Sequence, residues 1–203
     1  MWSLLPRSWQ LTLVIGSGVS VAWAIDAVYA LVFDNDPGVL HWISLAVTVV
    51  GSGFTFVGER CRRAIWRRFP VIQSKTFPDL NGVWEGPLVS TWIDPTTGAV
   101  PPPIPAVVTI RQGLFLTIVS LRTGESQSHS TRSFLEAFRD THRFRIWYSY
   151  NNDPVAQVQH RSSPHEGVAF LELDHDADPD RLTGRYYTAR KSTGDLDVRR
   201  TSR

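Results

Sequence analysis

The sequence predicts an all-β domain, an eight-stranded up-and-down antiparallel barrel, preceded by a two-helix transmembrane hairpin. Two observations carry this prediction. Two long apolar runs stand near the start of the 203 residues, and after residue 78 the chain changes to short runs in which apolar and polar side chains alternate. Apolar runs of about 20 residues can cross a bilayer, and alternation is typical of strands with one buried face.

The apolar runs occupy residues 11–33 and 39–57, and only Asp-Asn-Asp-Pro-Gly at residues 34–38 separates them. At about 1.5 Å of helical rise per residue, each run is long enough to cross a hydrocarbon core of about 30 Å. A turn of this length with Pro and Gly cannot hold a folded domain, so both ends of the hairpin return to the same side of the membrane. Residues 1–58 are therefore expected to form a transmembrane hairpin.

The distribution of charge gives the orientation. Arg7 precedes the first run, six basic residues follow the second within residues 59–77, and the turn between the runs carries acidic charges. By the positive-inside rule, we expect a multi-pass protein with both termini in the cytoplasm. A cleaved signal peptide is the alternative, but its apolar region would be about 7–15 residues long. From residue 78 onward, 14 basic residues stand against 15 acidic ones, so residues 59–77 form a basic juxtamembrane linker.

Residues 78–203 are expected to form a cytosolic β-barrel that senses a ligand. Most separators between its alternating runs are hairpin-sized, and no long helical period interrupts them. Closure into a lipocalin-like barrel removes both sheet edges, whereas a β-sandwich is the second possibility. The eight predicted strands are residues 82–93, 106–112, 115–121, 125–138, 144–151, 165–173, 182–190 and 194–200.

A barrel of this size is either filled by side chains or holds one small ligand. The period of two places Tyr148 and Tyr150 on one face of their strand, and Tyr186, Thr188 and Arg190 on one face of another. Three serines share a face of the fourth strand: Ser126, Ser128 and Ser130. If these faces point inward, they form a pocket with an apolar floor and a polar mouth, suited to an anionic nucleotide. The alternative is an ordinary Tyr-rich barrel whose polar residues face water.

The motif Gly82-Val83-Trp84 predicts how the other end of the barrel is closed. A Gly-x-Trp near the start of a small barrel commonly closes one end, with an Arg of the last strand packed on the indole. Arg199 or Arg200 could supply that guanidinium. We therefore predict a structural role for Trp84.

Catalysis has no positive support in the sequence. The six histidines show no zinc-ligand spacing, and neither a Gly-x-Ser-x-Gly motif nor a Gly-rich phosphate loop is present. We therefore expect a protein that is not an enzyme and that has neither a metal site nor a cofactor.

Six motifs in this order resemble a known family, the two-transmembrane, β-strand-rich effectors of bacterial CBASS anti-phage systems. These CD-NTase-associated membrane effectors carry a cyclic-nucleotide-sensing barrel. Leu114 departs from the pattern, where a bulkier aromatic side chain is expected. The motifs are PDLNGVWEG at 78–86, IRQ at 110–112, TGESQSHS at 123–130, YSYNNDP at 148–154, HEG at 165–167 and LTGRYYTARKSTG at 182–194.

The resemblance implies that a cyclic di- or trinucleotide, made by a partner cyclic-oligonucleotide synthase, binds the barrel. It further implies that the hairpins form a homo-oligomer that breaches the lipid bilayer of the bacterial inner membrane. The nucleotide either activates or restrains this step, and no DNA or RNA partner is expected. The candidate ligand-binding residues are Ser126, Ser128, Ser130, Tyr148, Tyr150, Asn151, His165, Tyr186, Thr188 and Arg190.

Candidate membrane-assembly residues lie within the two apolar runs. Ser44, Thr48 and Ser52 recur every four residues along the second run, and small or hydroxylated stripes let transmembrane helices approach closely. Asp26 lies inside the first run, where a carboxylate is costly and usually faces protein or water. Two other functions remain possible: a membrane-tethered lipocalin-like binder of a small apolar ligand, and an anchored enzyme on a barrel scaffold.

Overall fold

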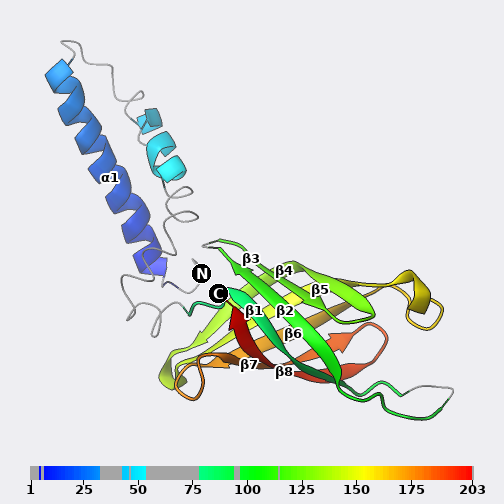
Figure 1. Cartoon of the computed structure of the whole chain (residues 1–203). Coiled ribbons are helices and arrows are strands. Elements are labelled where there is room, and N and C mark those ends of the chain that lie inside the picture. The colour runs from blue at the N-terminus through cyan, green and yellow to red at the C-terminus, as the bar shows by residue number, and fades with distance from the viewer. Residues whose placement is uncertain are drawn as a thin grey trace. The chain divides into compact units, whose positions relative to one another are not determined.

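The chain divides into two compact units, an N-terminal helical unit and a C-terminal β-barrel (Figure 1). This architecture comes from a computed structural model of the whole chain. The structure describes residue 5 and residues 7–32, 43–45, 47–53, 78–93, 97–113 and 115–202.

The N-terminal unit contains α1, which spans Arg7–Val32. Its segment Arg7–Tyr29 is long and apolar enough to cross a membrane, and none of the apolar window is buried against protein. Large side chains such as Trp9, Ile15 and Trp23 are exposed, as lipid-facing residues would be. The helical nature of the first predicted span is therefore confirmed.

Part of the second predicted span is also helical, at residues 43–45 and 47–53. The turn at 34–38, the remainder of the span and the basic linker at 59–77 lie outside the described residues. The transmembrane hairpin, its orientation and the domain boundaries therefore stay predictions.

The candidate membrane-assembly residues lie on exposed parts of these helices. Asp26, Ser44, Thr48 and Ser52 are all exposed. The Thr48 hydroxyl donates to the carbonyl oxygen of Ser44 at 2.9 Å, a bond within its own helix. This bond satisfies the hydroxyl within the helix.

The C-terminal unit is a closed barrel of eight antiparallel strands in sequence order, in which β1 pairs with β8 (Figure 1). The predicted up-and-down barrel is confirmed. The strands are β1 (Gly82–Ser90), β2 (Ile104–Gln112), β3 (Thr117–Arg122), β4 (Ser126–Phe138), β5 (Arg143–Pro154), β6 (His165–Asp174), β7 (Arg181–Thr188) and β8 (Thr193–Ser202). Two short 3₁₀ helices, η2 (Arg139–Thr141) and η3 (Ala156–Val158), lie beside β5.

Most strand ends lie within one or two residues of the prediction, and the two largest differences are at the ends of β1 and β5. β1 ends at Ser90 rather than at residue 93, and the Trp92 amide donates to the Ser90 hydroxyl at 3.1 Å instead of to a neighbouring strand. β5 runs three residues further than predicted, to Pro154, because residues 152–154 continue the ladder with β4. The extension adds the buried residues Asn152 and Pro154 to the barrel, and Asn152 lines a cavity at one end of it.

The barrel core follows the period of two along each strand. Its middle is filled by aliphatic side chains from several strands, and each of the following is at most 1% exposed: Val108, Ile110, Val119, Ile146, Leu171, Leu182 and Val198. Such dense packing leaves no room for a ligand in the middle of the barrel. The filled middle therefore separates the two ends.

Trp84 occupies the closed end, as predicted. Its side chain is fully buried, and the guanidinium carbon of Arg200 lies 4.1 Å from the ring centroid. The Trp84 Nε1–H donates to the carbonyl oxygen of Leu80 at 3.1 Å. Arg200, rather than Arg199, is therefore the residue of the last strand that packs on the indole.

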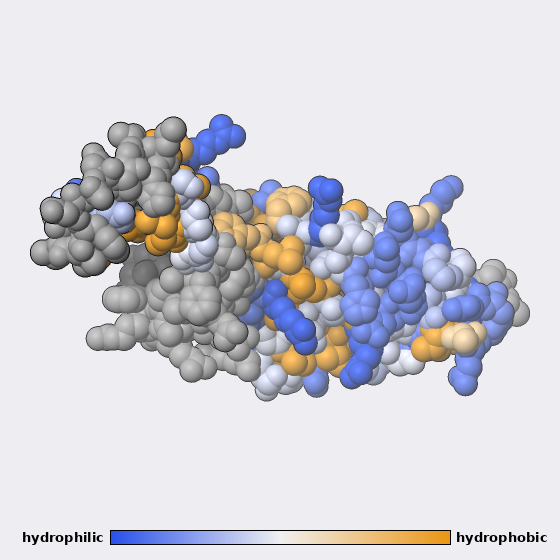
Figure 2. All heavy atoms as spheres, turned by 90° about the horizontal axis from the view of Figure 1, so that it is seen from above, coloured by the Kyte–Doolittle hydropathy of each residue, from blue (hydrophilic) through white to orange (hydrophobic). Residues whose placement is uncertain are grey.

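The outer wall also carries aromatic side chains. Across β4, β5 and β6, Trp147 lies 6.5 Å from Phe134 and 4.9 Å from Phe170, measured between ring centroids. The Arg145 guanidinium lies 4.7 Å from the Phe170 centroid and pairs with Glu172 at 2.6 Å. Figure 2 shows hydrophobic side chains interspersed with hydrophilic ones over one face of the barrel. The outward-facing residues are thus not uniformly polar.

Candidate functional site

A cavity of about 580 Å³ opens at the end of the barrel opposite Trp84. All eight strands contribute side chains to it, together with the turns that join β1 to β2, β3 to β4, β5 to β6 and β7 to β8. Pockets of a few hundred cubic ångströms suit one small molecule. The barrel is therefore filled at its middle and hollow at its open end.

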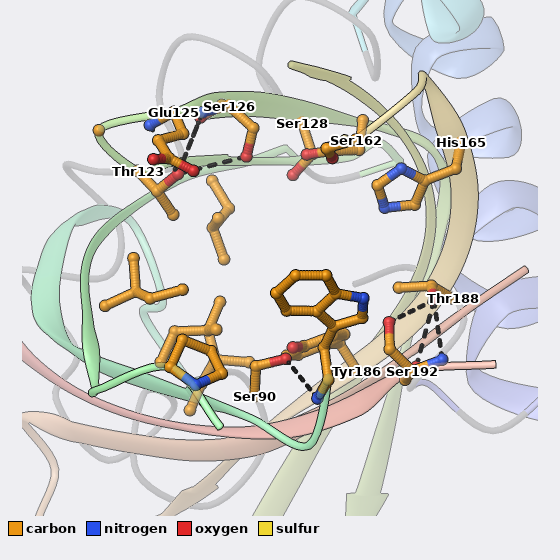
Figure 3. Close-up of a pocket in the computed structure, with 18 of the residues that line it drawn as sticks. Ser90, Thr123, Glu125, Ser126, Ser128, Ser162, His165, Tyr186, Thr188 and Ser192 are labelled. Carbon is orange, nitrogen blue, oxygen red and sulfur yellow. Dashed lines mark hydrogen bonds between the residues drawn. The ribbon is translucent and has the colours of Figure 1, made fainter. Parts of the chain in front are cut away.

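The floor of the cavity is mainly apolar, and its wall and rim are polar. Leu88, Leu121 and Leu196 line it from three different strands. Figure 3 shows hydroxyl groups around the opening, with Ser126 and Ser128 across the cavity from Ser90, Thr188 and Ser192. The predicted gradient from an apolar floor to a polar mouth is present.

Several of these hydroxyl groups bond to one another (Figure 3). Thr188 and Ser192 share a hydrogen bond of 2.7 Å between their hydroxyl oxygens. Thr123 and Ser126 do the same at 3.2 Å. These bonds tie the ends of each tight turn together, so they shape the rim and hold it in place.

Deeper in the cavity, four polar groups have no such partner. The side chains of Ser128, Tyr148, Tyr150 and Asn152 are at most 9% exposed, and all four line the cavity. No side-chain hydrogen bond joins any of the four to another described residue, and their polar atoms face the hollow end of the barrel rather than being enclosed in protein. Polar atoms that face a cavity can bond to water or to a ligand. Their position makes them available to a bound molecule.

Two glycines make room for the two tyrosines nearest the mouth. Gly167 lies opposite Tyr150 in the β5–β6 ladder, and an added Cβ would lie 2.4 Å from the Tyr150 ring. Gly194 lies opposite Tyr186 in the β7–β8 ladder, where a Cβ would lie 2.5 Å from that ring. Because the two glycines have no side chain, each tyrosine ring can lie against a glycine and leave the cavity unfilled.

Burial sets the protonation of these groups. Burial, reinforced by nearby Tyr186, raises the pKa of Tyr150 to about 12, although Arg190 acts against the shift. Burial likewise raises the pKa of Tyr148, with a further contribution from Tyr150. Both phenols are therefore neutral hydrogen-bond donors at physiological pH.

His165 is also neutral in the ligand-free barrel. Burial lowers its pKa, and the positive charge of Arg190 adds to that shift, while a hydrogen bond with the backbone of Ser163 opposes it. The imidazole reaches into the opening from the start of β6 (Figure 3). It is thus a titratable group beside a permanent cation.

Two guanidiniums stand at the mouth, Arg161 and Arg190. Arg190 Nη1 donates to the Ser162 hydroxyl at 3.0 Å. Arg161 pairs with Glu125, with a distance of 2.5 Å between Nη2 and Oε1. Guanidinium groups bind phosphate through paired hydrogen bonds, so the mouth can hold an anion.

The structure brings most of the predicted ligand-binding residues together. Two of them lie elsewhere. Asn151 points away from the cavity because it follows Tyr150 by one residue in an extended strand. The Ser130 hydroxyl accepts a hydrogen bond from the Val119 amide at 2.9 Å, next to a bulge between Ser130 and Arg132. The predicted residues that do line the cavity are Ser126, Ser128, Tyr148, Tyr150, His165, Tyr186, Thr188 and Arg190.

The prediction missed lining residues of two kinds. Asn152 could have been found, because it continues the alternation of Tyr148 and Tyr150. Arg161 and Ser162 lie in the loop between β5 and β6, and Glu125 lies in the turn before β4, where no periodicity marks a direction. Among the described residues, no group of three or more His, Cys, Asp or Glu side chains is arranged to hold a metal ion.

Comparison with known proteins identifies the domain. Residues 75–200 match the sequence model of the family described as "Cap15, cyclic dinucleotide receptor domain". The chain belongs to this family. A curated relative, CD-NTase-associated protein 15 of Staphylococcus schleiferi, is 23% identical over 162 residues, which cover 79% of this chain and 81% of the relative.

The family match tests the resemblance and the function that the sequence predicted. The resemblance to CBASS effectors is confirmed at the level of the family. The description of the matched domain as a receptor supports sensing rather than catalysis. The individual ligand contacts and the membrane-assembly residues stay predictions.

Proposed function

We propose that this protein is a CBASS effector whose barrel binds a cyclic dinucleotide in the cavity at its open end. The nucleotide, made by a partner synthase, controls the assembly of the apolar helices in the bacterial inner membrane. The observation that carries the proposal is the cavity itself, in which polar side chains that face the hollow lie below two guanidiniums. Membership in a cyclic dinucleotide receptor family supports the same conclusion.

Each part of such a ligand has a counterpart in the cavity. The rings of Tyr150 and Tyr186 offer faces on which a nucleobase can stack. The Tyr148 hydroxyl and the Asn152 amide offer hydrogen bonds to the edge of a base. Arg190 offers a guanidinium to a phosphate. A small apolar ligand would displace water from the polar groups that face the cavity without replacing its hydrogen bonds, so these groups disfavour the lipocalin-like alternative.

The effector step belongs to the helical unit. We propose that α1 and the second apolar run form a hairpin that places the barrel in the cytoplasm. Homo-oligomers then form through the stripe of Ser44, Thr48 and Ser52, which permits close helix packing, while Asp26 faces protein or water rather than lipid. The disruption of the inner membrane follows from this assembly.

Ligand binding can be tested by thermal-shift measurements on the full chain in detergent against a panel of cyclic di- and trinucleotides. A ligand at about 100 times its Kd adds about 2.7 kcal/mol of stability to the state that binds it. We expect a cyclic dinucleotide to raise the melting temperature of the barrel. The absence of any shift across the panel would contradict the proposal.

Assembly can be tested separately with Thr48→Leu/Ser52→Leu. Leucine keeps the segment apolar but blocks the close approach of helices. We expect this variant to insert in the membrane and to bind nucleotide normally, while losing the ability to depolarise the membrane when the synthase is active. Unchanged depolarisation would contradict the proposed helix interface without affecting the ligand site.

A further inference from the structure

One segment crosses the mouth of the cavity and is tied at both sides. This mouth segment, residues 155–164, joins β5 to β6 and includes η3. On one side the Val155 amide donates to the backbone oxygen of Glu125 at 2.9 Å, and Arg161 pairs with the Glu125 carboxylate. On the other side Arg190 donates to the Ser162 hydroxyl. The segment is therefore linked to the β3–β4 turn and to the β7–β8 turn.

The two arginines at the mouth are in different electrostatic states. The guanidinium of Arg161 is neutralised by a carboxylate, whereas Arg190 contacts a neutral hydroxyl. Among the ion pairs of the described residues, Glu125–Arg161 is the one whose two members both line the cavity. A carboxylate and a phosphate offer similar oxygen atoms to a guanidinium, so they compete for it.

We propose that Glu125 is a built-in competitor of a ligand phosphate. This inference rests on the proposed function. A cyclic dinucleotide carries two phosphates, and it engages Arg190 directly and Arg161 by displacing the Glu125 carboxylate. Both mouth arginines are then paired with phosphate, and the link between the mouth segment and the β3–β4 turn is released.

The exposure of the pair makes the exchange feasible. The side chains of Arg161 and Glu125 are 46% and 58% exposed, so the displaced carboxylate returns to water without a large desolvation cost. Exposed ion pairs contribute little stability, typically below about 1 kcal/mol. The competitor therefore lowers the affinity for a dinucleotide by about two- to fivefold rather than blocking it.

Charge removal at the two members of the pair gives opposite results under this proposal. Glu125→Gln removes the competitor and leaves Arg161 free, so the affinity rises about two- to fivefold. Arg161→Gln removes a phosphate contact, so the affinity falls by about tenfold or more. Glu125→Gln/Arg161→Gln behaves like Arg161→Gln alone, because the competitor acts only through Arg161. A pair that serves only to hold the loop predicts changes of the same sign for both single variants.

The experiment uses the full chain in detergent, with cyclic di-AMP, cyclic di-GMP, cyclic GMP–AMP and cyclic UMP–AMP as separate probes in isothermal titration. Asp197→Asn is the matched control, because Asp197 pairs with Arg181 at 2.6 Å and neither residue lines the cavity. This variant leaves the affinity unchanged. Hydrogen exchange without ligand provides a second measurement, in which both single variants speed exchange of the mouth segment.

The outcomes separate the inference from the proposed function. Higher affinity for Glu125→Gln together with lower affinity for Arg161→Gln supports the competitor. Unchanged or lower affinity for Glu125→Gln, with a probe bound by the wild-type chain, overturns the competitor and leaves the proposed function intact. Unaltered exchange in the mouth segment of both variants overturns the link. A wild-type chain that binds none of the four probes overturns both proposals.

Discussion

The two ends of the barrel use similar residues for opposite purposes. At the closed end, the Arg200 guanidinium packs on the Trp84 ring and donates to the backbone oxygens of Asn81 and Asp79, and it pairs with Asp180. At the open end, Arg190 and three tyrosines surround a cavity. Arginine and aromatic side chains thus close one end and line a cavity at the other.

The difference between the ends lies in whether the polar side chains bond within the protein or face a cavity. Buried Gln112, at the closed end, accepts a hydrogen bond from the Leu80 amide and donates one to the Pro78 carbonyl oxygen. At the open end, the side chains of Tyr148 and Asn152 make no hydrogen bond to another described residue and face the cavity. Polar groups that bond within the protein favour a rigid structure, whereas polar groups that face a cavity can bond to a ligand.

The largest effect is expected from Trp84→Ala at the closed end. Removal of this fully buried indole leaves a cavity, and it should lower the free energy of unfolding by about 3–5 kcal/mol. Denaturant titration followed by circular dichroism measures the change. The folded fraction should bind nucleotide with unchanged affinity. A selective loss of binding at unchanged stability would mean that Trp84 contacts the ligand.

Arg190→Ala should have the converse effect at the open end. The loss of a charge-assisted hydrogen bond to phosphate weakens binding by about 1.5–3 kcal/mol, or roughly 10- to 150-fold in Kd. The stability of the ligand-free barrel should barely change. Arg185→Ala is the control, because Arg185 lies on β7, which ends at Thr188 just before the turn that carries Arg190, and it pairs with Asp195 and does not line the cavity. Equal affinities for the two variants would remove Arg190 from the site.

Gly167→Ala tests the placement of Tyr150. The new Cβ would crowd both the Tyr150 ring and the Tyr187 backbone oxygen, so we expect a loss of about 1–3 kcal/mol in stability and weaker nucleotide binding. Gly184→Ala provides the comparison, since its Cβ would crowd the Phe170 backbone oxygen away from the cavity. It should lower stability alone. Normal nucleotide binding by Gly167→Ala would show that the position of the ring is not important.

A smaller effect is expected from pH. Because the pKa of His165 is lowered in the ligand-free barrel, the unfolded chain binds more protons as pH falls through about 6.5, and acidification lowers this contribution to stability. An anionic ligand nearby favours the protonated ring, so its affinity should rise as pH falls from 8 to 6. His165→Gln should remove both trends relative to the wild type. A pH dependence of affinity that persists in this variant would assign it to another group.

The sequence was most informative where a period repeats along a strand. Alternation identified all eight strands and the inward direction of Tyr148, Tyr150 and Tyr186, and the Gly-x-Trp pattern identified Trp84 as the closing residue. These features follow from local rules of side-chain direction and from the need to bury an indole.

The sequence was least informative where the backbone departs from that period. The bulge beside Ser130 shifts the alternation of β4, and no residue type in that run predicts the position of the bulge. The direction of Arg161 depends on η3 and on a partner 36 residues earlier in the chain, Glu125. Contacts of this kind arise from the closed barrel and not from the local sequence.

Tyr148→Phe offers the most direct test of the comparison between the two ends, because it removes only a hydroxyl that faces the cavity and makes no hydrogen bond to another described residue. Thermal-shift measurements with and without a saturating cyclic dinucleotide report stability and binding together. We expect the ligand-free melting temperature to stay the same or rise, and the affinity to fall by about 0.5–1.5 kcal/mol, the net contribution of one hydrogen bond. A ligand-free barrel that is destabilised by Tyr148→Phe while its affinity for the nucleotide is unchanged would contradict the account.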